Sequence, residues 1–195
     1  LEAIRAGTRE YEVAAQAEYA MRRSGSSGFA FETLVASGPR SAYPHGVCSD
    51  REIKQGDLVI VDLGAVWKGY CSDITRTVTV GSPSLKNKRL LELIQEAHDK
   101  VLNEIRPGVE AADVDAVARK VVGEDCARYF IHGLGHGIGL DIHEAPTLSQ
   151  TSRDVLEAGN VVTDEPGMYF PGYGGVRIED TILITSKGAE KLTGA

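Results

Sequence analysis

Apolar residues recur at the spacing of a helix in three segments of the chain, and each segment is predicted to form an amphipathic helix. The longest covers residues 85–106 and is ended by Pro107 and Gly108. Another runs from Thr8, as its capping residue, to about Arg23, and the third follows Gly108. On the longest helix the repeating apolar positions are Leu90, Leu91, Ile94, Ala97, Val101, Leu102 and Ile105.

Two details qualify this helical pattern. His98 falls within the longest predicted helix and is interpreted as an ordinary helix residue. Residues 1–7 are predicted as the last turns of an earlier helix that Gly7 closes, because glycine is common just past a helix end. Since that helix lacks its beginning, we expect a region upstream of this chain.

Shorter apolar or alternating runs predict β-strands, and four of these strands carry or precede an isolated acidic residue. The acidic residues are Asp62, Asp73, Glu165 and Glu179. In chain order, the strands are predicted at residues 29–35, 58–61, 72–80, 161–163 and 176–185.

The order of elements repeats once along the chain. Three segments resemble later ones, namely 1–7 and 102–108, 56–64 and 159–167, and 73–75 and 179–181. This duplication places an acidic residue at two equivalent positions in each half, with the halves approximately at residues 1–85 and 86–195. Two like halves facing each other would bring four carboxylates together at a pseudo-two-fold axis. The alternative is chance similarity among short apolar strands.

Composition sets limits on the class of protein. The 195 residues, 42% of them hydrophobic, suffice for one domain, and the net charge of −7 argues against nucleic-acid binding. No apolar run reaches the length of a membrane span, and no signal peptide opens the chain. Three widely spaced cysteines, without a CxxC pair, fit reduced structural thiols and predict a cytoplasmic location.

The stretch at residues 131–144 is the most unusual in the chain. It holds three of the five histidines, His132, His136 and His143, with glycines around the first two. Glycine lets other groups approach the backbone closely, so these histidines are open to an ion or a substrate. A glycine-rich loop with incidental histidines is the alternative.

Four carboxylates cannot share one cavity as bare anions, because each raises the pKa of the others and burial adds to the penalty. Divalent cations remove this problem. The four acids and one imidazole form an oxygen-rich set for two metal ions roughly 3.5–4 Å apart, which acidify a bridging water and polarise a carbonyl. Such a set suits Mn, Co, Fe or Zn, with Mn or Co favoured. Strand-end acids in solvent are the alternative for any single residue.

These residues resemble the metallopeptidases of the pita-bread fold, namely methionine aminopeptidase, aminopeptidase P and prolidase (Xaa-Pro dipeptidase), with creatinase as a metal-free relative. The resemblance covers nearly the whole chain. Its motifs lie at residues 44–45, 61–64 with 70–77, 132–139 with 143–146, 164–169, and 175–180. It implies an α+β fold of two related halves around a curved, mainly antiparallel sheet. Residues 1–195 then form a catalytic domain that lacks the N-terminal domain of prolidases and the first part of its own opening helix.

The resemblance also implies five metal ligands. Asp62 resembles the ligand that chelates one ion, and Asp73 and Glu179 resemble the carboxylates that bridge both. His136 and Glu165 resemble ligands of the other ion, and Glu165 also resembles the residue that transfers protons to and from the bridging water. The sequence leaves open which group accepts the hydrogen bond that would orient the ligand histidine.

Four further residues resemble substrate-binding groups of the family. His143 resembles the histidine that hydrogen-bonds the substrate carbonyl and the tetrahedral intermediate, and His45 resembles the histidine on the substrate side of the cavity. His132 and Arg177 resemble the pair near the prolyl residue and its carboxylate, with support of Glu179 as an alternative role for Arg177.

The function implied is a dinuclear metallo-exopeptidase that hydrolyses Xaa-Pro bonds by a metal-bridged hydroxide, as a prolidase-like dipeptidase or an aminopeptidase P. Glu-Pro-Gly-Met-Tyr at 165–169 and Gly-Val-Arg-Ile-Glu-Asp at 175–180 are closer to these two than to methionine aminopeptidase. A methionine aminopeptidase and a non-catalytic binding module are the alternatives, and the complete ligand set argues against the module and creatinase. The family habit implies a homodimer for the full-length protein. Substrate length, the native metal and the activity of this fragment alone stay open.

Overall fold

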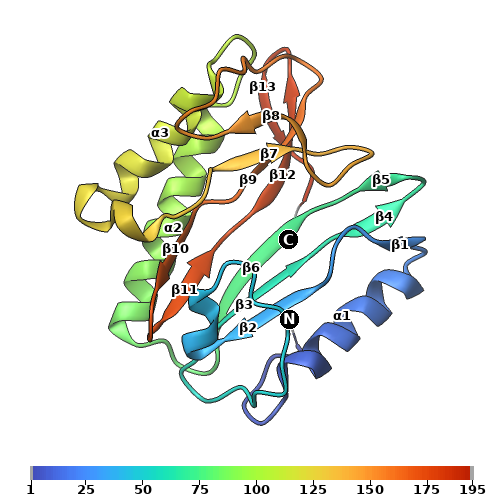
Figure 1. Ribbon diagram of the computed structural model, residues 1–195, viewed down its shortest axis with the longest axis vertical. Helices are drawn as coiled ribbons and strands as arrows, with labels where there is room; N and C mark the ends of the chain where they lie inside the picture. Colours follow the sequence, from blue (N-terminus) through green and yellow to red (C-terminus); the bar gives the residue numbers. More distant parts are fainter. Residues whose placement is uncertain (1, 194–195) are drawn as a thin grey trace.

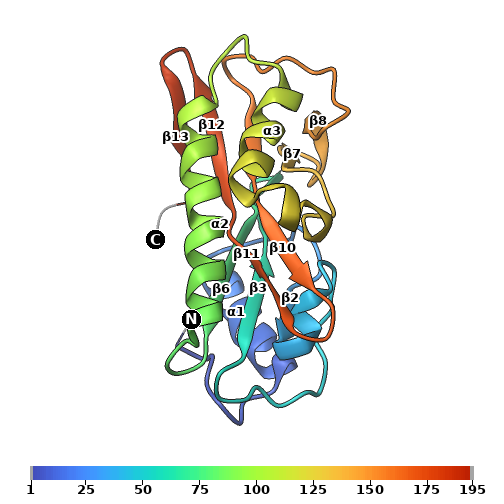
Figure 2. The same ribbon diagram turned by 90° about the vertical axis from the view of Figure 1, so that its left-hand side faces the viewer.

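Strands form the middle layer of the molecule, with helices on both sides (Figure 1). The computed structural model describes residues 2–193. Helix α1 (Glu10–Arg23) lies on one side, and α2 (Leu85–Glu104) and α3 (Ala111–Val122) lie together on the other. Figure 2, from the side of α2, shows α2 and α3 in front of the strands and α1 behind them. None of the helices in the described residues has the length and apolar character needed to cross a membrane.

All strand pairings are antiparallel. One sheet has the order β2 (Leu34–Ser37), β3 (Leu58–Leu63), β6 (Ile74–Thr79). The largest has the order β13 (Gly188–Lys191), β12 (Asp180–Thr185), β9 (Val161–Asp164), β7 (Gly135–Gly137), β8 (Glu144–Leu148). Two small sheets consist of β10 (Gly167–Phe170) with β11 (Gly174–Arg177), and of β1 (Gly28–Phe29), β4 (Ala65–Trp67) and β5 (Tyr70–Cys71). Short 3-10 helices cover Gly38–Ala42 and Glu124–Tyr129.

The apolar faces predicted from the sequence build two cores. Ile94, Ala97 and Val101 of α2 are fully buried and pack with α3, β9 and β12. Val13 and Ala14 of α1 belong to a separate cluster with strands of the β2–β3–β6 sheet. Each of the two larger sheets is therefore packed against helices, the β2–β3–β6 sheet against α1 and the largest sheet against α2 and α3.

The predicted helix turns at the start of the chain are wrong for residues 2–7, which form turns and irregular backbone, while Leu1 lies outside the described residues. The Gly7 N–H donates to the Ile53 carbonyl at 2.9 Å, and the Ile53 N–H donates to the Thr8 carbonyl at 2.9 Å. These bonds occupy backbone groups that a helix would use. Helix α1 accordingly begins at Glu10, with Arg9 rather than Thr8 as its N-cap.

Two predicted strands are each divided between sheets. The strand expected at 29–35 is β1 and β2, because the Ala30 N–H donates to Gly64 (2.9 Å) and the chain then changes partner. The strand expected at 176–185 is β11 and β12, and between them the Glu179 N–H donates to the Thr75 carbonyl at 3.1 Å. This break brings Glu179 against the β2–β3–β6 sheet. Asp62 lies inside β3, not after it, and Asp73 lies just before β6.

Backbone hydrogen bonds recur at the places where the sequence repeats. The Gly7 to Ile53 bond of 2.9 Å has a counterpart of 2.8 Å from Gly108 to Leu156. A second pair of equivalent bonds joins Gly56 to Val80 (2.9 Å) and Gly159 to Ile184 (2.8 Å). The four glycines all have φ between +86° and +98°, a region that glycine adopts without strain. The division of the chain near residue 85 stays a prediction.

Candidate metal centre

A cavity of about 440 Å³ lies where the two larger sheets meet. Its lining includes all nine residues predicted for the site: His45, Asp62, Asp73, His132, His136, His143, Glu165, Arg177 and Glu179. Phe31, Leu34 and Ile142 add apolar wall. A larger groove of about 770 Å³ beside α2 contains none of the nine. The chemistry predicted from the sequence is therefore gathered in one place.

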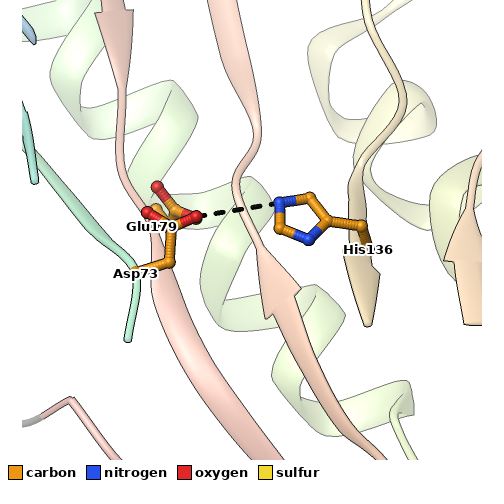
Figure 3. A group of neighbouring side chains, drawn as sticks. All are labelled: Asp73, His136 and Glu179. Carbon is orange, nitrogen blue, oxygen red and sulfur yellow. Dashed lines mark ion pairs between the residues drawn. The ribbon is translucent and has the colours of Figure 1, made fainter. Parts of the chain in front are cut away.

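Three of the predicted ligands lie close enough to share an ion. One ligand atom each from Asp73, His136 and Glu179 lies within 4.8 Å of the other two, and Figure 3 shows the two carboxylates facing the imidazole. The Nε2 atom of His136 lies 3.7 Å from Asp73 Oδ2 and 3.3 Å from Glu165 Oε1. The ligands thus come from both larger sheets and from the break between β11 and β12.

The acids of this cavity are buried and repel one another. Burial, and then the charges of Asp62 and Glu165, raise the pKa of Asp73 to about 8. Burial, and then the charges of Glu165, Asp73 and Asp62, raise the pKa of Glu179 well above its ordinary value, and burial raises that of Asp62 despite Arg177. Among the described residues, Asp62 Oδ1, Asp73 Oδ1 and Glu179 Oε1 are buried without a hydrogen-bond partner. Buried oxygens of this kind are stabilised by a bound cation or a proton.

His136 is held with one ring nitrogen free for a ligand. Its Nδ1 lies 3.0 Å from the Gly137 carbonyl, and its backbone N–H donates to Thr163 Oγ1 at 3.0 Å. An Nδ1–H donor leaves Nε2 facing the carboxylates, where it can bind a metal ion or, without one, carry a proton shared with Glu165. A Cβ atom at Gly135 would lie 2.1 Å from the Thr163 carbonyl oxygen, and one at Gly137 would lie 2.3 Å from the Ala145 carbonyl oxygen. Glycine on each side of His136 therefore lets the neighbouring backbone close around it.

Arg177 is buried and binds the protein itself. Its Nη2 donates to Asp62, its Nε to Thr75 Oγ1 at 3.1 Å, and its Nη1 to Tyr169 OH at 2.8 Å and to the Pro44 carbonyl at 3.2 Å. Thr75 Oγ1 in turn donates to Glu179 Oε2 at 2.6 Å. Arg177 thus contacts Asp62 directly and reaches Glu179 only through Thr75.

Tyr169 joins Arg177 to His132. The Tyr169 hydroxyl lies 2.8 Å from His132 Nε2, and His132 Nδ1 lies 2.6 Å from the Gly133 carbonyl. Burial raises the pKa of Tyr169 to about 12, so the phenol keeps its proton and can donate it to Nε2. Tyr169 and Thr75 were not singled out from the sequence, although both lie inside the motifs at 164–169 and 70–77.

Glu10 anchors the loop that carries His45. Both serines at the ends of this loop, Ser37 and Ser49, donate their backbone N–H and hydroxyl groups to the Glu10 carboxylate at 2.6–3.0 Å. Arg40 Nε donates to Glu10 Oε2 at 3.0 Å. Although burial opposes it, these donors lower the pKa of Glu10, which stays ionised and closes the loop.

An ion pair on α3 anchors the segment that carries His132. Arg119 pairs with Asp115 at 2.6 Å and donates to the carbonyls of Phe130 (2.9 Å) and His132 (2.7 Å). Asp115 Oδ1 accepts the Leu134 N–H at 3.0 Å. The chain from 130 to 134 is therefore bound to α3 just before it delivers His136. His143 follows this segment, and its ring centroid lies 4.3 Å from that of His136.

His98 does not behave as the ordinary helix residue that the sequence suggested. It is 1% exposed, and its two ring nitrogens lie 2.8 Å from Asp164 Oδ2 and 2.9 Å from Asp180 Oδ2. These aspartates are sequence neighbours of Glu165 and Glu179. Helical spacing alone places His98 on the buried face of α2 but gives no sign of what it meets there.

Comparison with known proteins finds a matching family model, similar sequences and similar solved structures. The model of metallopeptidase family M24 matches residues 1–186. The chain is 52% identical over 194 residues to the Xaa-Pro dipeptidase of Pyrococcus furiosus, covering 99% of this chain and 56% of that protein. The solved prolidase from Pyrococcus furiosus superposes with a TM-score of 0.98 at 51% identity, over 100% of this chain and 58% of that one. The X-Pro aminopeptidase from Thermotoga maritima gives 0.96 at 43% identity, over 100% and 55%.

The chain therefore belongs to metallopeptidase family M24 and has the pita-bread fold, which confirms the resemblance seen in the sequence. It spans about half the length of the relatives it matches.

Proposed function

We propose that this chain is the catalytic part of a dinuclear metal-dependent exopeptidase that hydrolyses Xaa-Pro peptide bonds. The observation that carries the proposal is the set of buried carboxylate oxygens of Asp62, Asp73 and Glu179 that have no protein donor within residues 2–193. Relatives named Xaa-Pro dipeptidase and X-Pro aminopeptidase support the choice of bond. The apolar wall of Phe31, Leu34 and Ile142 suits a prolyl ring or an apolar side chain.

The residues present fit two divalent ions. Asp62, Asp73, His136, Glu165 and Glu179 would hold them. Four carboxylates and one imidazole favour Mn or Co. Such ions, when bound, acidify a water molecule and polarise the scissile carbonyl.

Glu165 and His143 are proposed to serve the reaction itself. Although burial opposes it, the hydrogen bond from His136 lowers the pKa of Glu165, so its carboxylate is ionised and can accept a proton. Thr163 Oγ1 lies 3.2 Å from Glu165 Oε1, which leaves Oε2 for this transfer. Burial, and then His136, lower the pKa of His143, so a neutral ring can donate an N–H to the oxygen on which negative charge develops.

His45, His132 and Arg177 are proposed to shape the substrate side of the cavity. His45 lines it from the loop anchored by Glu10, and His132 lines it from the segment anchored by Arg119. Arg177 uses four of its N–H groups on the protein, so its proposed role is to orient Asp62 and, through Tyr169, His132.

The test is hydrolysis of Met-Pro, Ala-Pro, an Xaa-Pro tripeptide and Met-Ala-Ser, with added Mn²⁺ or Co²⁺ and after chelation. Cleavage of dipeptides alone indicates a prolidase, tripeptide cleavage an aminopeptidase P, and Met-Ala-Ser cleavage a methionine aminopeptidase. Glu165→Gln and His143→Ala should abolish turnover with the fold intact. No metal bound in calorimetry would contradict the proposal and favour a binding module. The homodimer and the cytoplasmic location of the whole protein stay predictions.

A further inference from the structure

His98, Asp164 and Asp180 form a buried group on the side of the large sheet that faces α2, away from the cavity. Their exposed fractions are 1%, 0% and 1%. His98 lies 2.9 Å from Asp180 through Nε2 and 2.8 Å from Asp164 through Nδ1, the second contact being an ion pair outside hydrogen-bond angles. The proposed reaction uses none of these three groups.

The two aspartates face each other across neighbouring strands. Asp164 on β9 is the direct partner of Asp180 on β12. Like charges at directly opposite positions push strands apart. Asp180 also pairs with Arg76 (2.8 Å) and Lys191 (3.0 Å), whereas His98 is the one ion-pair partner that the described residues give Asp164.

The same strand positions lead directly into two proposed metal ligands. Glu165 follows Asp164, and Glu179 precedes Asp180. Because successive side chains of a strand point to opposite faces, an aspartate directed at α2 leaves its neighbour directed at the cavity. The hydrogen-bond contact of Thr163 with Glu165, 3.2 Å, is consistent with this alternation. The position of each ligand therefore depends on where its aspartate is held.

His98 carries the positive charge that balances Asp164 and Asp180. Burial lowers the pKa of His98, but the two carboxylates outweigh burial and raise it to about 9. An imidazolium between two carboxylates attracts both strands to α2.

We infer that His98 is a positioning residue of the metal centre, which ties β9 and β12 to α2 at the spacing where Glu165 and Glu179 face Asp73 and His136. This inference rests on the proposed metal function. A purely structural ion pair would have a different consequence, because its loss would lower stability without a specific effect on metal affinity.

The test compares His98→Gln with Val101→Ala, a matched control. Val101 is fully buried on the same helix, lies in the apolar core, and has no acidic partner. The readouts are Mn²⁺ dissociation constants by calorimetry, the visible spectrum of the Co²⁺-loaded chain, and the thermal midpoint after chelation. We expect His98→Gln to weaken Mn²⁺ binding about 10–100-fold and to alter the Co²⁺ spectrum. Val101→Ala should lower the thermal midpoint with both metal readouts unchanged.

A double-mutant cycle sharpens this test. Asp164→Asn alone keeps the pair of His98 with Asp180 and should weaken Mn²⁺ binding only several-fold. Combined with His98→Gln it removes the repulsion between the strands, so the double variant should bind Mn²⁺ as tightly as Asp164→Asn alone. Asp164→Asn also serves if His98→Gln does not fold, because unchanged affinity in that variant would overturn the inference.

The outcomes separate this inference from the proposed function. Mn²⁺ binding by His98→Gln within twofold of the unchanged chain, or equal weakening in Val101→Ala, would overturn the positioning role and leave the metal function intact. Absence of metal binding by the unchanged chain would overturn both.

Discussion

The two larger sheets bring acidic residues to the cavity in similar ways but differ in what lies behind those residues. At the fourth cross-strand pair, β3 and β6 place Val61 opposite Arg76, whereas β9 and β12 place Asp164 opposite Asp180. The first pair carries one charge, and Arg76 pairs with Asp180 of the other sheet at 2.8 Å. The second has two carboxylates, and His98 of α2 is the cation that contacts both of them. Cross-strand pairs at the same place in the two sheets can therefore carry opposite charge when another element supplies the counter-charge.

The acidic residues that line the cavity also differ in where their positively charged or imidazole partners come from. Asp62 of the β2–β3–β6 sheet is neutralised by Arg177, which comes from β11 in the other half of the chain. Glu165 instead has His136 from its own sheet at 3.3 Å. The β2–β3–β6 sheet thus depends on the β10–β11 sheet for the charge balance of its ligand, and the following predictions test this dependence.

The largest effect is expected for Arg177→Met. Removing one member of a buried ion pair leaves Asp62 without its cation, so the free energy of unfolding of the chelated chain should fall by about 3–5 kcal/mol. Urea unfolding in the presence of a chelator measures this. Arg177→Lys, which keeps the charge but not the planar group, should recover part of the loss. A fall below about 1 kcal/mol would show that the β2–β3–β6 and β10–β11 sheets are electrostatically independent.

His98 should make the stability of the large sheet depend on pH. Its pKa is raised to about 9, so its contribution is fully present below the unfolded value of about 6.5 and is lost as pH rises through 9. The stability advantage of the chelated chain over His98→Gln should therefore decline by about 3 kcal/mol from pH 6 to pH 10. Chemical unfolding at several pH values measures it. Groups that do not contact His98 titrate alike in both proteins and cancel, and a constant difference would contradict the assignment of charge to His98.

Glu10→Gln should act on the loop of His45 and spare the metal ligands. The amide loses acceptors for donors from Ser37 and Ser49, so stability should fall by about 1–3 kcal/mol. Limited proteolysis within residues 38–48 should accelerate, with Mn²⁺ affinity unchanged. Glu18→Gln on the same helix is the control. Equal proteolysis of both variants would argue against the anchoring role of Glu10.

The smallest effect concerns protons that compete with metal. The pKa of Asp73 is raised to about 8 without an ion, so this carboxyl contributes stability at low pH that is lost as pH rises through 8. Metal binding should then release a proton near neutral pH and strengthen by up to about 1.4 kcal/mol per pH unit below 8. Calorimetry in buffers of different ionisation enthalpy counts the proton. The Asp73→Asn variant should release fewer protons on metal binding than the unchanged chain. An equal number of protons would contradict the raised pKa of Asp73.

Much of the site was readable because its residues sit in short motifs. Asp62, Asp73, Glu165 and Glu179 stand within or next to strands that apolar and alternating runs predict, and glycines mark the surroundings of His136. Tyr169 and Thr75 lay inside those motifs, yet the hydrogen bond of Thr75 with Arg177 joins two sheets, and that of Tyr169 with Arg177 joins the paired strands β10 and β11. No local pattern records such a contact.

The sequence by itself determined the apolar faces of three helices, the strands that carry the acids, and the family to which the chain belongs. These follow from local periodicity and from motifs that chemistry restricts. The tertiary structure decided the irregular backbone at 2–7, the break that turns Glu179 into the cavity, and the partners of His98. Each of these depends on pairing between residues far apart in the chain, where register, burial and charge are settled together and no single segment contains the information.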